Sequence, residues 1–167
     1  MYTYKYSVTE QKVIADCTLN PTDIHQSEGG CFLWALNDKY DSATVDSRKV
    51  GKWMVFLPKH SINAAWDKVK LAVSEGNLWQ AKVSTVNPKN SSHVLIIYTK
   101  DYTDLNDVII TLKTLESYGI KSPSTVIYYK TDEQTYAGIY AGGKQKPWIY
   151  RSDTICEIRT TSSGNLH

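Results

Sequence analysis

The chain has 167 residues, of which 41% are hydrophobic and 22% are charged, and its formal net charge is +2. These values are ordinary for one globular domain, so they argue against a disordered chain, and no window of the sequence approaches the length of a membrane span. The three cysteines (Cys17, Cys31 and Cys156) are an odd number without CxxC spacing, and the first residues carry no secretory pattern. We therefore expect a cytoplasmic protein with reduced thiols, no metal and no cofactor.

Positive charge is concentrated in the middle of the chain. Residues 44–100 contain nine Lys or Arg against three acidic residues, whereas residues 1–43 contain three against six and residues 101–167 contain seven against eight. A solvated basic surface is one interpretation of this bias, and a binding site for an anion is the other.

Residues 1–30 are polar and weakly periodic, so we predict an irregular N-terminal arm. A single α+β domain is predicted over residues 31–157, followed by a frayed tail over residues 158–167. The apolar run at residues 31–36 predicts the first strand of the domain, and the polar stretch at residues 37–50 predicts a loop.

Residues 52–57 form a short apolar run that ends at Pro58, which predicts a strand. A helix follows, with Ser61 as its expected cap and Gly76 at its end. Its apolar face has helical spacing and consists of Ile62, Trp66, Val69 and Val73.

Two further strands are predicted at residues 80–86, which alternate in polarity, and at residues 93–99, which are apolar and rich in β-favouring side chains. A second helix then begins after Thr103 and Asp104, its expected caps, and ends at Gly119. The apolar face of this helix consists of Leu105, Val108, Leu112 and Leu115.

Near the C-terminus, residues 125–129 and 148–151 predict strands, while residues 135–140 fit either a strand or a helical turn. The connections at residues 88–92 and 142–146 have the length of hairpin loops, so we expect an α+β fold with a largely antiparallel sheet. Each helix has one apolar face, so both should cover the same side of the sheet and leave the other side for a ligand or for solvent.

Several familiar catalytic motifs are absent from the sequence, namely GxGxxG, GxxxxGK[ST], HExxH and GxSxG. Their absence argues against a Rossmann or P-loop nucleotide site, a zinc protease and an α/β-hydrolase. His60 lies beside a predicted helix start and His93 at the start of a strand, and we interpret both as surface or capping residues.

Lysines stand at strand positions instead. Lys52 opens one predicted strand, Lys82 lies inside the next and Lys130 ends a third, while Tyr98 and Lys100 share a parity at the end of the most apolar strand. If these strands are neighbours, the ammonium groups converge on one face, where a phosphate would offset their repulsion. The alternative is that these lysines keep the edges of the sheet soluble.

The ordered blocks DSRKVGKWMVF, LWQAKVST, HVLIIYTKDYTDLNDV and YYKTDEQTYAGIY resemble the basophilic-leukaemia-expressed protein family over roughly residues 31–151. The resemblance implies the fold of the messenger-RNA cap-binding initiation factor 4E, a curved antiparallel sheet with helices on its convex side. In those factors two Trp rings sandwich a methylated guanine and basic residues hold the phosphates. Here Trp34 is a candidate for one ring, and the candidates for the other are Trp53, Trp66 and Trp79.

The same blocks are similar to bacterial phosphothreonine lyases, which eliminate phosphate with a lysine base and a histidine acid. This similarity implies that Lys82 is the base, while Met54 stands where the histidine is expected. The groups implied to hold the phosphate are Lys52, Tyr98, Lys100 and Lys130.

Our leading hypothesis is a phosphate-recognising domain that binds a nucleotide or a phosphopeptide on the concave side of the sheet, through Lys52, Lys82, Tyr98, Lys100 and Lys130. Loss of the acid favours binding over catalysis, because general acid catalysis contributes about 10²–10⁴-fold to the rate. The alternatives are a phosphothreonine lyase-like enzyme with Lys82 as base, and a protein that reads or sequesters a cap-like nucleotide. A module that binds only a protein partner also remains open, since the many Tyr and Trp residues suit such a surface.

Overall fold

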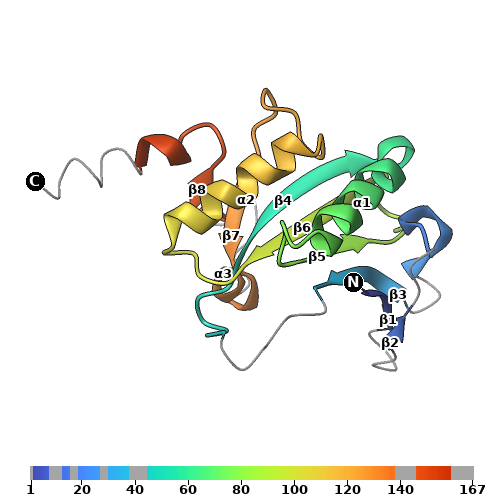
Figure 1. The fold of residues 1–167 in the computed structure, drawn as a ribbon. Helices are drawn as coiled ribbons and strands as arrows, with labels where there is room; N and C mark the ends of the chain where they lie inside the picture. The colour runs from blue at the N-terminus through green and yellow to red at the C-terminus, as the bar shows by residue number, and fades with distance from the viewer. Residues whose placement is uncertain are drawn as a thin grey trace, which may run out of the picture.

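The computed structural model describes residues 2–7, 13–15, 19–26, 30–37, 45–137 and 146–158. Its strands form one curved sheet in the order β2-β1-β3-β5-β6-β4-β7-β8, and all seven pairings between neighbouring strands are antiparallel (Figure 1). The α+β class and the antiparallel sheet expected from the sequence are thereby confirmed. The strands are β1 (Tyr2–Ser7), β2 (Val13–Ala15), β3 (Gly30–Leu36), β4 (Gly51–Pro58), β5 (Gln80–Ser84), β6 (Ser92–Thr99), β7 (Tyr128–Thr131) and β8 (Tyr150–Arg151).

Two long helices, α1 (Lys59–Ser74) and α2 (Leu105–Ser117), pack on the same face of this sheet and share one apolar core with it. The predicted apolar faces are confirmed, since Ile62, Trp66 and Val69 are fully buried and Leu112 is 1% exposed. The described fold also has two short helices, the 3-10 helix η1 (Pro21–Asp23) and α3 (Asp132–Tyr136), and a helical segment at residues 155–158. None of these helices has the length and apolar character needed to cross a membrane.

The structure confirms most of the predicted helix caps and ends and contradicts one of them. The Asp104 side chain accepts a hydrogen bond from the backbone N–H of Asp107, as a cap of α2 should. Gly76 and Gly119 follow the two helices with φ of +80° and +70°, which glycine adopts without strain. The prediction that Ser61 caps α1 is wrong, because the helix already begins after Pro58 and the Ser61 hydroxyl donates to the Pro58 carbonyl.

The two ends of the sheet differ from the sequence predictions. Residues 2–7 and 13–15, expected in an irregular arm, form β1 and β2, and β1 pairs with β3 along its length. Alternating tyrosines favour such a strand, but its partner is more than twenty residues away and is not evident from the local sequence. The strand predicted at residues 125–129 begins only at Tyr128, where the chain reaches Met54 of β4.

The remaining C-terminal predictions have mixed outcomes. Residues 135 and 136 of the ambiguous segment belong to α3, and the final strand is confirmed as the two-residue β8. Residues 138–145, which include most of the predicted second hairpin loop, and residues 159–167 of the predicted tail lie outside the described residues.

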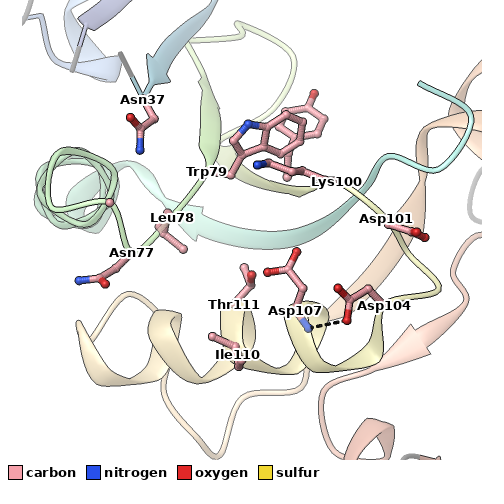
Figure 2. A pocket seen from close by; sticks show the side chains of 12 residues that line it. Asn37, Asn77, Leu78, Trp79, Lys100, Asp101, Asp104, Asp107, Ile110 and Thr111 are labelled. Carbon is pink, nitrogen blue, oxygen red and sulfur yellow. Dashed lines mark hydrogen bonds between the residues drawn. The ribbon is translucent and has the colours of Figure 1, made fainter. Parts of the chain in front are cut away.

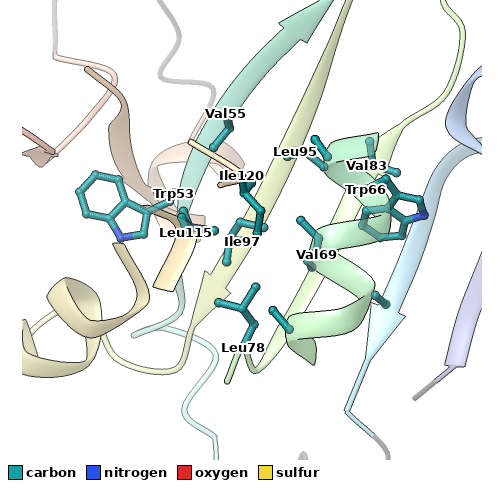
Figure 3. Packing of buried hydrophobic residues seen from close by; sticks show 14 of the residues in the cluster. Trp53, Val55, Trp66, Val69, Leu78, Val83, Leu95, Ile97, Leu115 and Ile120 are labelled. Atoms are coloured by element: carbon teal, nitrogen blue, oxygen red, sulfur yellow. The ribbon is translucent and has the colours of Figure 1, made fainter. Parts of the chain in front are cut away.

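Two of the tryptophans considered as ligand-binding rings belong to the core beneath the helices. Trp53 is fully buried, and its Nε1–H donates to the Val108 carbonyl of α2 at 3.0 Å. Trp66 is fully buried on α1 (Figure 3). Both indoles therefore stabilise the packing of helices on the sheet, and neither lies on the opposite face where a ligand was expected.

A close approach at the start of β4 positions β7. A Cβ atom at Gly51 would overlap the Tyr129 ring, so only glycine leaves room for it. The Tyr129 hydroxyl shares a hydrogen bond of 2.5 Å with Thr99 Oγ1, and its ring meets the Trp53 ring edge-on at 5.3 Å. These contacts enclose the Tyr129 ring on the helix-covered face of the sheet.

Candidate functional site

Strand pairing brings three of the four predicted lysines to one face. Lys52 lies directly between Tyr98 of β6 and Lys130 of β7, and Lys82 of β5 lies opposite Trp34 of β3. Directly paired side chains point to the same side of a sheet, and here that side is opposite α1 and α2. We call this surface the lysine face and define it as Trp34, Lys52, Lys82, Tyr98 and Lys130.

Lys52 and Lys82 both lie near the ring of Tyr98. Their Nζ atoms are 5.8 Å and 5.9 Å from its centroid. Burial first, and the positive charge of Lys52 second, lower the pKa values of Lys82 and Lys130. The charge of Lys52 therefore acts on both of the other ammonium groups, and such a gathering of positive charge is what a phosphate site requires.

Asp132, which the sequence analysis did not single out, balances part of this charge. Its Oδ1 atom accepts a hydrogen bond of 2.7 Å from Lys52 Nζ, and the two side chains are only 16% and 7% exposed. Asp132 is the first residue of α3, directly after the Thr131 cap. A Thr-x-x-Gln capping box after a strand could have indicated this helix start, but not that its aspartate turns toward Lys52.

Lys82 lies among aromatic rings. Its Nζ atom is 4.2 Å from the centroid of Phe32 and 5.0 Å from that of Trp34, in addition to the contact with Tyr98. Trp34 and Tyr98 are nearly parallel, with an interplanar angle of 7° and a centroid separation of 5.8 Å. We call Phe32, Trp34 and Tyr98 the aromatic cage, since together they surround the ammonium group of Lys82.

The titration of Lys82 provides a direct test of this environment. Burial and the charge of Lys52 lower its pKa to about 8, so we expect its side-chain NMR resonances to titrate with a midpoint near that pH. The unfolded chain, with a lysine pKa of about 10.4, binds more protons between these pH values, so stability should rise across this interval. Lys82→Met should remove that rise in the free energy of unfolding, measured with urea. A midpoint at the ordinary lysine value would contradict the described burial.

Lys100 lies apart from the other three lysines. It is exposed, and its Nζ atom is 5.7 Å from the ring of Trp79. Both residues line a cavity of about 390 Å³ that lies between α2 and the ends of the central strands β5 and β6, and Tyr98 of the lysine face lines it too. Asp107 of α2 points into this cavity from the other side (Figure 2). Burial, and then the charge of Asp104, raise the pKa of Asp107.

A second, smaller cavity of about 210 Å³ adjoins the aromatic cage. Phe32 belongs to both, and Phe56, which is 64% exposed, adds another ring. Asn87 and Asn90 contribute amide groups to the same cavity. The lysine face is thus flanked by a hollow that combines flat apolar surfaces with hydrogen-bonding groups, as small-molecule sites commonly do.

Neither His60 nor His93 faces the lysines. His93 is buried opposite Leu57 on the helix-covered side, with its Nδ1 atom 2.8 Å from the Ser84 carbonyl oxygen. His60 is exposed in the first turn of α1. Met54, at the position where a histidine acid was expected, lies on the lysine face side of β4, opposite Ile96. In the described part of the chain, no cluster of three His, Cys, Asp or Glu side chains could hold a metal.

The fold of this chain is similar to solved structures of eIF4E-3 bound to cap ligands. The Ascaris suum eIF4E-3 complexes with m2,2,7G cap and with m7G cap match with TM-scores of 0.57 and 0.56, at 13% and 14% identity, over 89% of this chain and 93% and 92% of theirs. The complex of C. elegans eIF4E-3 with the 4E-binding protein Mextli and a cap analog matches with a TM-score of 0.56 at 15% identity, over 89% and 93% of the chains. The predicted initiation factor 4E-like fold is confirmed.

A family model identifies the family to which this chain belongs. The model of the family described as basophilic leukemia-expressed protein Bles03 matches residues 36–138, and the chain belongs to that family. The match includes Lys52, Lys82 and Lys130 but not Phe32 or Trp34 of the aromatic cage. The similarity to phosphothreonine lyases stays a prediction.

Proposed function

We propose that this protein binds a phosphorylated small molecule, a nucleotide, on the lysine face. The observation that carries the proposal is the gathering of Lys52, Lys82 and Lys130 beside the aromatic rings of Trp34 and Tyr98. The lysines would hold the phosphate groups, and the aromatic and amide-lined surfaces beside them would contact the rest of the ligand.

The balance of charges supports an anionic ligand. Lys52 is paired with Asp132, yet its charge still lowers the pKa values of Lys82 and Lys130. Ammonium groups at this spacing repel one another, and partial burial strengthens the repulsion. A phosphate would offset it and would supply several strong hydrogen-bond acceptors.

A nucleotide is favoured over a phosphopeptide by the surroundings of the lysines. Flat rings suit a nucleobase, and base–aromatic stacking contributes about 1–3 kcal/mol for each base. The cavity next to Phe32 offers the side-chain amides of Asn87 and Asn90. The fold of cap-binding factors agrees with this choice, although a shared fold alone does not establish a shared ligand.

Binding without catalysis is the form of the proposal that the geometry favours. An elimination would use Lys82 as base, and its lowered pKa suits that role. The leaving phosphate also needs a proton, and Met54 cannot donate one. Mass spectrometry of a phosphothreonine peptide separates the alternatives, because a lyase removes the elements of phosphoric acid and leaves a dehydrated residue. We expect the peptide to be unchanged.

Thermal denaturation with added ligand tests the binding proposal. We expect pyrophosphate and guanosine diphosphate to raise the melting temperature, because a ligand that binds only the folded state stabilises it. Lys130→Ala should abolish most of the shift, and Lys82→Ala should reduce it. Lys89→Ala, which removes an exposed lysine from the β5–β6 turn, is the matched control and should keep it. Equal shifts in all three variants, or none in the unmodified protein, would refute the proposal.

A further inference from the structure

We propose that Lys82 makes the site selective, because its ammonium group occupies the aromatic cage and excludes ligands whose base is positively charged. The inference rests on the proposed function and specifies its ligand, a nucleotide with a neutral base. It distinguishes this chain from the eIF4E-3 structures, whose bound ligands are methylated caps.

The aromatic cage already contains a cation. Rings within about 6 Å of an ammonium group attract it, and cages of such rings commonly bind quaternary ammonium ligands from outside. Here the Nζ atom of Lys82 lies 4.2 Å, 5.0 Å and 5.9 Å from the centroids of Phe32, Trp34 and Tyr98. The negative faces of these rings therefore already have a cationic partner within the protein, the ammonium group of Lys82.

The spacing of Trp34 and Tyr98 leaves no slot for a base between them. Parallel rings cannot be farther apart than their centroids, which are 5.8 Å apart. An inserted base needs about 3.5 Å on each side, or about 7 Å between the flanking rings. The pair is thus in offset contact, and a base must approach from outside it, next to Lys82.

A second ammonium group strengthens the exclusion. Lys52 Nζ lies 5.8 Å from the Tyr98 ring, so a cationic base stacked there would meet two like charges. Trp79, another tryptophan outside the main core, also has a lysine near its ring, Lys100 at 5.7 Å. A neutral guanine suits this environment better, since lysine commonly donates to its N7 and O6 acceptors, and methylation at N7 removes one of them.

Calorimetric titration of two nucleotides that differ by one methyl group tests the inference. At about pH 6.5, below the lowered pKa of Lys82, we expect guanosine diphosphate to bind at least about ten-fold more tightly than 7-methylguanosine diphosphate. Lys82→Ala empties the cage, and the ratio of the two affinities should fall to about one or reverse, whatever the loss in overall affinity. Lys82→Arg keeps the charge and should keep the preference.

Tetramethylammonium provides a readout that does not depend on phosphate binding. We expect no binding by the unmodified protein and measurable binding by Lys82→Ala, followed by NMR of the ring protons. Equal or tighter binding of the methylated nucleotide by the unmodified protein would overturn the selectivity but leave the proposed function intact. An unchanged ratio of the two nucleotide affinities in Lys82→Ala would also overturn the selectivity and leave the proposed function intact. No binding of either nucleotide by any variant would overturn the proposed function, while a gain of tetramethylammonium binding in Lys82→Ala would still support the occupied cage.

Discussion

Asp132→Asn is expected to lower the free energy of unfolding by about 3 kcal/mol and, at the same time, to tighten the binding of pyrophosphate. The substitution leaves the Lys52 ammonium group, which is only 7% exposed, without its carboxylate. Removing one partner of a buried ion pair costs about 3–5 kcal/mol of stability. The cost of Asp132→Asn should be at the lower end of this range, because the asparagine oxygen still accepts a hydrogen bond. The added net charge on the lysine face should attract an anion more strongly.

A double-mutant cycle separates the charge from other effects. Lys52→Met combined with Asp132→Asn leaves no buried charge at this position, so the double variant should be more stable than Asp132→Asn alone in urea unfolding. Pyrophosphate affinity should rise several-fold in Asp132→Asn and fall in the double variant. If the two single changes are additive in stability, the pair does not contribute in the way its geometry indicates. If affinity falls in Asp132→Asn, the phosphate does not bind beside Lys52.

Trp53→Ala is expected to lower the free energy of unfolding by about 3–5 kcal/mol without changing ligand affinity in the folded protein. The fully buried indole fills the space between β4 and α2 and donates to the Val108 carbonyl, so its loss leaves a cavity and an unused acceptor. Urea unfolding measures the change in stability, and calorimetry with guanosine diphosphate measures the affinity.

Trp53→Phe and Trp66→Phe form a matched comparison. Each removes part of a fully buried indole, but only Trp53 has a hydrogen-bond acceptor for its Nε1–H among the described residues. Trp53→Phe should therefore be the more destabilising of the two, since Trp66→Phe also removes a buried N–H without a described partner. A change in affinity in Trp53→Phe, with little change in stability, would instead indicate that this ring contacts the ligand.

Local patterns were sufficient for the elements that form the centre of the molecule. The helical spacing of Ile62, Trp66 and Val69 predicted which face of α1 is buried, and the apolar runs of β4 and β6 predicted two strands, which the structure pairs with each other. These features depend on a few neighbouring residues, so the sequence displays them directly.

Other features depend on contacts between distant parts of the chain. Nothing near residues 2–7 reveals that this segment pairs with β3, and nothing near Asp132 reveals its contact with Lys52, eighty residues away. The same limit applies to Lys100, whose parity matches that of Tyr98 but which lies beyond the end of β6 and beside Trp79. The aromatic cage combines rings from β3 and β6, on either side of Lys82 in β5, so these residues had no common pattern in the sequence.

The close approach of Gly51 and Tyr129 also has a consequence for strand register. β7 has only four residues, and a slip by one position along β4 would bring Lys130 to the helix-covered side and turn Tyr129 outward. The ring that fits over the glycine, held by Thr99, opposes this slip. Gly51 has no side chain, and its contact with Tyr129 lies on the helix-covered side of the sheet. This contact nevertheless determines that Lys130 lies on the lysine face.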